Sequence, residues 1–148
     1  MTDYNILNGQ LRRITQGVPH RIANLANASA LLFNTLEEVN WSGFYIIAGD
    51  KLVLGPFQGK TACIEIPVGR GVCGGAVAQN KTLVIGNVHK FDGHIACDSN
   101  SLSEIVVPIR KDGKIVGVLD IDSPIENRFS EADRIGLEQF VRIIEDIW

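Results

Sequence analysis

Hydrophobic positions recur with a helical period at both ends of the chain. Apolar residues follow the 3.6-residue period over residues 4–14 and again over about residues 20–38, with Gly17-Val18-Pro19 between the two segments. Near the other end, Ser130 and Asp133 have the spacing of a capping box, which predicts that the last helix begins there. We expect the buried face of this helix to consist of Ile135, Leu137, Phe140, Val141 and Ile144.

In the middle of the chain the period changes to two, which is typical of strands. Residues 41–47 and 51–54 flank Gly49-Asp50, residues 103–110 and 114–122 flank Asp112-Gly113, and each pair predicts a β-hairpin. Shorter segments predict strands at residues 63–66 and 83–85 and a helix at residues 74–79. This order favours an α+β domain spanning residues 1–148, with a central antiparallel sheet, N- and C-terminal helices on one face and ligand loops on the other.

Composition and charge fit this picture and exclude two classes of partner. A chain of 148 residues with 45% hydrophobic and 21% charged residues suits one core. No apolar run approaches the roughly 20 residues that cross a membrane, and the first residues lack the layout of a secretion signal, so we expect a cytoplasmic protein without a membrane partner. The 14 Lys and Arg residues are scattered and outnumbered by 17 Asp and Glu residues, which argues against binding to nucleic acid.

Three cysteines, Cys63, Cys73 and Cys97, are the unusual part of the composition. An odd number in a reducing compartment argues against a purely structural disulfide framework, which leaves a redox site, a metal site or inert buried thiols. Cys97 lies in a polar loop, residues 86–101, whose length is typical of a functional loop, and we expect it to cover a ligand pocket. A zinc site would need a fourth ligand such as His94, and the close cysteine pairs of structural zinc sites are missing.

Acidic residues are placed to meet at one end of the second hairpin. Asp120 and Asp122 are two positions apart on one strand, so both side chains project from the same face. Glu104 begins the partner strand, and pairing across the turn brings it near Asp120. Clustered carboxylates raise one another's pKa, so one can stay protonated and donate a proton while the others bind an ammonium group. Solvated strand ends explain any single one of these acids, but three beside a cysteine loop favour a site.

The first strand carries two aromatic residues on one face. Trp41, Gly43 and Tyr45 share that face, whereas Phe44 points to the other side. We expect Gly43 to leave a gap between the two rings, which would form an aromatic slot. Ordinary core packing explains the same pattern equally well, although Trp and Tyr suit a half-polar pocket because their polar atoms need partners.

Several short motifs are spread along the chain. They are ANLAN at residues 23–27, WSGFY at 41–45, GVCG at 71–74, GHIACD at 93–98, SEIVVP at 103–108 and GVLDIDSP at 117–124. Together they resemble the free methionine-(R)-sulfoxide reductases, which are single GAF domains, and the resemblance covers essentially the whole chain. Two positions depart from the family pattern, because Asn87 stands where an Asp is expected and Asp92 where a Pro is expected.

The resemblance implies an enzyme that reduces free L-methionine (R)-sulfoxide to L-methionine without a cofactor or a metal. The cysteine matching Cys97 is the nucleophile of the family, the one matching Cys63 resolves the sulfenic acid as a disulfide, and the one matching Cys73 has an auxiliary part in recycling. The resemblance also gives substrate-binding roles to the residues at five positions, which are Glu104, Asp120, Asp122, Trp41 and Tyr45.

Partners and rival functions follow from the same resemblance. It implies free methionine sulfoxide as substrate, thioredoxin as the reductant that reopens the disulfide, and a homodimer. The principal alternative is a GAF-type small-molecule or redox sensor that binds without catalysis. A zinc-stabilised interaction domain is a third interpretation.

Overall fold

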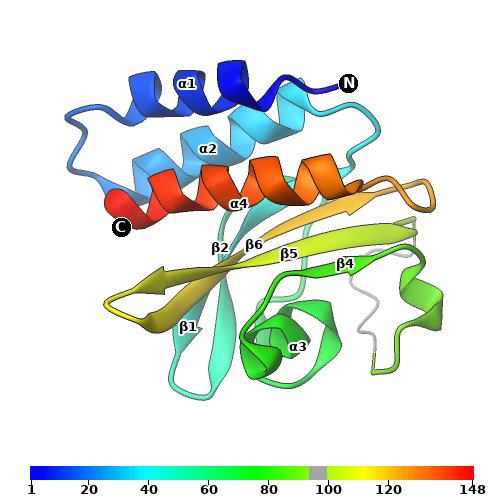
Figure 1. Ribbon diagram of the computed structural model, residues 1–148. Coiled ribbons are helices and arrows are strands. Elements are labelled where there is room, and N and C mark those ends of the chain that lie inside the picture. The colour runs from blue at the N-terminus through cyan, green and yellow to red at the C-terminus, as the bar shows by residue number, and fades with distance from the viewer. Residues whose placement is uncertain (94–99) are drawn as a thin grey trace.

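The computed structural model describes residues 1–93 and 100–148, and its elements form three layers (Figure 1). In chain order the elements are α1 (Tyr4–Thr15), α2 (Arg21–Thr35), β1 (Trp41–Ala48), β2 (Lys51–Gly59), β3 (Glu65–Pro67), α3 (Gly71–Gln79), β4 (Leu83–Ile85), the 3-10 helix η1 (Val88–Lys90), β5 (Ser103–Lys111), β6 (Lys114–Ser123) and α4 (Glu131–Asp146). The six strands form one antiparallel sheet in the order β3-β2-β1-β6-β5-β4. The predicted α+β class with a central antiparallel sheet is confirmed.

The two faces of the sheet are covered unequally. Helices α1, α2 and α4 lie on one face, as predicted, and α3 lies on the other (Figure 1). The larger core lies under the three helices and includes Leu7, Leu11, Leu25, Leu32, Phe44, Ile105, Leu119, Ile121, Leu137, Phe140 and Ile144. A second, smaller core lies under α3, because alternate side chains of the same strands project to that side. The second face is therefore the one available for a site.

Local signals in the sequence set the boundaries of several elements correctly. The side chain of Ser130 accepts a hydrogen bond from the Asp133 N–H, and the Asp133 side chain accepts one from the Ser130 N–H, which completes the predicted capping box of α4. Asp112 and Gly113 have φ values of 54° and 79°, which suits a tight turn between β5 and β6. This turn sets the pairing of Lys111 with Lys114, and the register shifts by one residue between Ile109 and Arg110.

Two predictions from periodicity were wrong. The strand expected from Cys63 begins at Glu65, and β2 continues to Gly59, so Cys63 lies in an irregular connection between β2 and β3. In α4, Ile135 is 46% exposed and Ile143 is buried instead. Two residues along a helix correspond to a rotation of about 200°, so Ile135 cannot share a face with Leu137.

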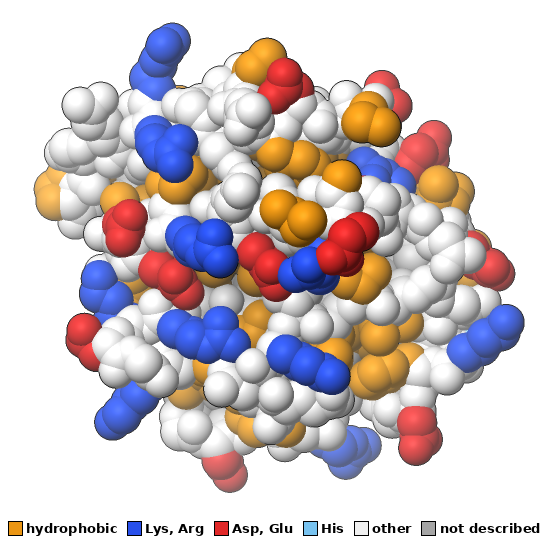
Figure 2. Space-filling view, viewed as in Figure 1, with side chains coloured by type: hydrophobic (Ala, Val, Ile, Leu, Met, Phe, Trp, Pro, Cys, Tyr) orange, Lys and Arg blue, Asp and Glu red, His pale blue; other side chains and the backbone are white. Residues whose placement is uncertain are grey.

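Opposite charges are interspersed on the surface. On the face seen in Figure 2, Lys and Arg side chains alternate with Asp and Glu side chains. On α4, for example, Arg134 forms ion pairs with both Glu131 and Glu138. Among the described residues, no helix has the length and the apolar character that crossing a membrane requires.

Candidate active site

The three predicted acids meet on the α3 face of the sheet. Glu104 of β5 pairs with Asp122 of β6, and Asp120 of β6 pairs with Gly43 of β1. The side chains of these acids project to the same side because residues two apart on a strand share a face. Glu104 is 8% exposed and Asp120 is 5% exposed, so the cluster lies inside the protein and not at solvated strand ends.

Burial gives Glu104 an unusual protonation state. Removal from water raises the pKa of the Glu104 carboxyl well above its ordinary range, and the neighbouring charges of Asp120 and Asp122 raise it further. Side-chain hydrogen bonding to both aspartates contributes to the same rise in pKa. A protonated Glu104 can donate to an aspartate oxygen, so the cluster holds a proton at neutral pH beside remaining negative charge. Such a cluster can both protonate an oxygen atom and bind a cationic group.

Helix α3 places Cys73 directly against the acids. Val72 and Ala76 of α3 pack in the smaller core and hold this helix on the sheet. Cys73 is 3% exposed and is a free thiol. Burial raises the pKa of the Cys73 thiol, and the charge of Asp120 adds to this effect, so the thiol stays protonated.

One group of side chains in the described part of the chain has the geometry to hold a metal ion. Cys73, Glu104 and Asp120 each offer one ligand atom, and these atoms lie within 4.8 Å of one another. The zinc site considered from the sequence used the cysteines together with His94. Cys63 is disulfide-bonded and therefore offers no thiolate to zinc, and His94 lies outside the described residues.

The aromatic residues of β1 share one face, but the predicted slot between them was wrong. Trp41 and Tyr45 are 3% and 2% exposed, and their rings stack with centroids 5.9 Å apart. Phe57 of β2, which no sequence pattern singled out, also stacks on Trp41 at 5.1 Å. A Cβ atom on Gly43 would lie 2.3 Å from the Phe57 Cβ. Gly43 therefore allows β2 to approach β1 at a bulge and does not open a gap for a ligand.

The polar atoms of the two rings contact the connection that carries Cys63. The Tyr45 hydroxyl donates a hydrogen bond to the Cys63 carbonyl at 2.9 Å, and the Trp41 Nε1 donates one to the Lys60 carbonyl at 3.0 Å. Cys63 is half-buried at the edge of the smaller core. Cys97, the predicted nucleophile, lies outside the described residues.

The two departures from the family pattern lie in the segment that leads to Cys97. Asn87 Oδ1 accepts a hydrogen bond from the His89 N–H at 2.9 Å, and Asn87 Nδ2 donates one to Glu126 Oε1 at 3.0 Å. Asn87 thus begins η1 and also ties this segment to the connection between β6 and α4. Asp92 is exposed in a turn.

Comparison with known proteins identifies the family. The family model for the GAF domain matches residues 8–146. The Escherichia coli (strain K12) protein named "Free methionine-R-sulfoxide reductase" is 53% identical over 97% of this chain and 87% of its own length. The chain belongs to the free methionine-R-sulfoxide reductase family.

Another relative and two solved structures are similarly close. "Protein YtsP" of Bacillus subtilis (strain 168) is 58% identical over 97% of this chain and 89% of its own length. The reduced form of the fRMsr of Staphylococcus aureus has a TM-score of 0.96 and 53% identity, covering 99% of this chain and 96% of that chain. The same protein in complex with its substrate has a TM-score of 0.95 and 52% identity, with the same coverage.

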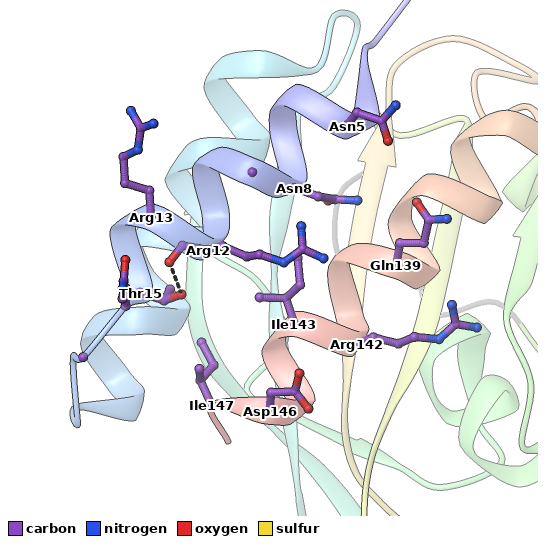
Figure 3. Close-up of a pocket in the computed structure, with 13 residues that line it drawn as sticks. Asn5, Asn8, Arg12, Arg13, Thr15, Gln139, Arg142, Ile143, Asp146 and Ile147 are labelled. Carbon is purple, nitrogen blue, oxygen red and sulfur yellow. Dashed lines mark hydrogen bonds between the residues drawn. The ribbon is translucent and has the colours of Figure 1, made fainter.

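This member of the reductase family also has a groove between α1 and α4, with a volume of about 910 Å³ (Figure 3). Asn8 of α1 and Ile143 of α4 point into the space between the helices, whereas Arg13 points away from it (Figure 3). Arg12 and Arg142 add positive charge to the lining. The groove and the acid cluster lie on opposite faces of the sheet, so this groove does not belong to the candidate active site.

Proposed function

We propose that this protein reduces free L-methionine (R)-sulfoxide to L-methionine. The observation that carries the proposal is the cluster of Glu104, Asp120 and Asp122, in which Glu104 and Asp120 are buried and the pKa of Glu104 is raised by burial and by its two neighbours. Such a cluster supplies the proton that sulfoxide reduction consumes. Additional support comes from the E. coli relative, whose name states this activity, and from the S. aureus structure with bound substrate.

In this proposal the acids and the aromatic residues bind different parts of the substrate. Asp120 and Asp122 hold the substrate ammonium group, and Glu104 protonates the sulfoxide oxygen. The rings of Trp41 and Tyr45 line the methyl-thioether end of the substrate. This role is supported by the position of both rings on the face of β1 that adjoins Asp120. A buried ammonium site gives a physical reason for restriction to the free amino acid, because a peptide amide at the same position has no positive charge.

The proposed chemistry uses two cysteines in sequence. The Cys97 sulfur attacks the sulfoxide sulfur, the oxygen passes to Cys97 as a sulfenic acid, and methionine leaves with the two electrons that Cys97 supplies. The Cys63 thiol then attacks the sulfenic sulfur, so that water leaves and a disulfide forms. The support for this pairing is that Cys63 is disulfide-bonded, that Cys73 is a free thiol, and that the sequence contains three cysteines. Cys73 has an auxiliary part in recycling.

An external dithiol must reopen the disulfide before the next turnover. Thioredoxin, with a reduction potential of about −270 mV, is suited to this step in the cytoplasm. No bound cofactor takes part in the proposed cycle, because the electrons come from thiols. Two thiols and one sulfoxide give one disulfide, one thioether and one water molecule.

The test is consumption of NADPH coupled through thioredoxin reductase and thioredoxin. Free methionine (R)-sulfoxide should support turnover, whereas the free (S)-epimer and a peptide-bound (R)-sulfoxide should not. Binding of the free (R)-sulfoxide without consumption of NADPH, and without formation of methionine when dithiothreitol replaces thioredoxin, would refute the enzyme and favour the sensor alternative. Equal rates with the peptide-bound form would refute the ammonium-binding role of the acids.

A further inference from the structure

The connection between β2 and β3 is irregular but is held at several points. We call residues 59–64 the Cys63 segment, and beyond Gly59 it contains neither helix nor strand. Its far end is fixed to the sheet because the Leu54 N–H donates a hydrogen bond to the Ile64 carbonyl at 2.9 Å. Between these ends, Trp41 and Tyr45 contact the segment through their polar atoms.

Trp41 fixes the beginning of the Cys63 segment. Its Nε1 donates to the Lys60 carbonyl at 3.0 Å, directly after Gly59. Gly59 has a φ of 127°, and a Cβ atom there would lie 2.7 Å from the Trp41 Cδ1 and 2.8 Å from the Asn40 carbonyl oxygen. The backbone can bring the Lys60 carbonyl to the indole only because residue 59 is a glycine. The hydrogen bond between Trp41 and Lys60 thus depends on two residues of the sequence, the donor Trp41 and the neighbouring Gly59.

Tyr45 fixes the segment at the cysteine itself. Its hydroxyl donates to the Cys63 carbonyl at 2.9 Å, and its ring is held by stacking on Trp41. Burial raises the pKa of Tyr45, and the charge of Asp120 raises it further, so the hydroxyl keeps its proton and remains a donor. The hydrogen bond restrains Cys63 through its backbone carbonyl and does not engage its sulfur.

We infer that Trp41 and Tyr45 are positioning residues for Cys63. Their two hydrogen bonds hold the Cys63 segment on one path along the sheet, and they thereby restrict where the Cys63 sulfur can lie when its disulfide forms. This inference rests on the proposed function, in which Cys63 resolves the sulfenic acid, and it adds a role to that of lining the substrate. Without the two donors, the reduced segment gains freedom, so the disulfide becomes less favourable and forms more slowly.

The reduction potential of the Cys63 disulfide tests this inference directly. Tyr45→Phe and Trp41→Phe keep an aromatic ring but remove the donor, and each should lower the equilibrium constant for disulfide formation about three- to tenfold. A tenfold change raises the potential by about 30 mV. The measurement is equilibration in dithiothreitol redox buffers followed by thiol alkylation and mass spectrometry.

Tyr4→Phe is the matched control. Tyr4 donates its hydroxyl to Asp133 at 2.6 Å on the other side of the sheet, so its loss should leave the potential unchanged. Near-ultraviolet circular dichroism identifies which variants are folded. An unchanged potential in both folded site variants, or an equal shift in Tyr4→Phe, would overturn the positioning role.

A single-turnover experiment separates this inference from the proposed function. After one equivalent of free methionine (R)-sulfoxide, dimedone should trap more sulfenic acid in Tyr45→Phe than in the wild type, because Cys63 attacks the sulfenic acid more slowly. Equal trapping in the two proteins would contradict the positioning role. A wild-type protein that does not consume the sulfoxide would refute the proposed function, and the potential of the Cys63 disulfide, measured without substrate, would still decide the role of the two aromatic residues.

Discussion

Replacing Glu104 with glutamine should make the protein more stable at neutral pH and much less active. Glu104 is buried, and burial together with Asp120 and Asp122 raises its pKa well above the ordinary value of 4.5. Glutamine has the shape of the protonated acid and keeps a donor for the aspartates, but it never ionises. Glu104→Gln therefore removes an unfavourable protonation equilibrium and leaves the fold intact.

The magnitude follows from proton linkage. Above pH 4.5 the unfolded chain releases the Glu104 proton while the native protein retains it, so the stabilisation from this group is complete below pH 4.5 and falls as pH rises. The loss is about 1.4 kcal/mol per pH unit until the native carboxyl ionises, which sets a ceiling of about 3 kcal/mol at pH 7. Subtracting about 1 kcal/mol for altered hydrogen bonds leaves about 2 kcal/mol, or a Tm gain of about 4–8 °C.

The assay is thermal melting from pH 4.5 to pH 8 alongside steady-state kinetics. The Tm gain of Glu104→Gln should vanish near pH 4.5, and its kcat/KM should fall about ten- to a hundredfold, because a charge-assisted hydrogen bond and the proton donor are lost. Glu65→Gln is the control, since Glu65 is exposed and pairs with Lys51, and it should show neither effect. A Tm that falls at pH 8, combined with normal kinetics, would show that Glu104 is ionised and merely structural.

Three further changes test other parts of the structure. Cys97→Ser should abolish turnover in the thioredoxin-coupled assay because no other sulfur is proposed to attack the substrate, and near-normal rates would exclude the mechanism. Asn87→Asp should lower the Tm by roughly 1–3 °C at pH 7 but less at pH 4, because it replaces the donor to Glu126 with a second carboxylate. Tyr4→Phe should lower the Tm by about 2–4 °C in calorimetry through loss of the hydrogen bond to Asp133, and an unchanged Tm would show that this bond contributes nothing.

Features that depend on neighbouring residues could be predicted from the sequence. The Asp112-Gly113 turn places the two strands of its hairpin side by side, and a one-residue shift of the register between Ile109 and Arg110 then brings Glu104 opposite Asp122. Strand alternation likewise places Trp41 and Tyr45 on one face. The turn and the strand period, which can both be read along the chain, therefore place the acids at the same end of the hairpin, whereas the register shift that aligns Glu104 with Asp122 has no local signal.

Features that depend on distant residues could not be predicted in this way. Cys63 lies outside a strand because Trp41 and Tyr45, far earlier in the chain, hold its connection by hydrogen bonds to the backbone. Phe57 fills the space at Gly43 through a bulge that no local motif announces. The one available signal was Gly59, since a glycine at a strand end often marks a close backbone contact.

The enclosure of Cys73 has a consequence for catalysis in solution. Its thiol is almost inaccessible and stays protonated, and a thiol in that condition attacks neither alkylating reagents nor disulfides. Any part that Cys73 takes in recycling therefore requires a transient opening of the structure around this thiol, as happens in local unfolding. The rate at which excess iodoacetamide labels this one thiol would thus measure the rate of that opening. This opening rate is the upper limit on how often Cys73 can take part in recycling.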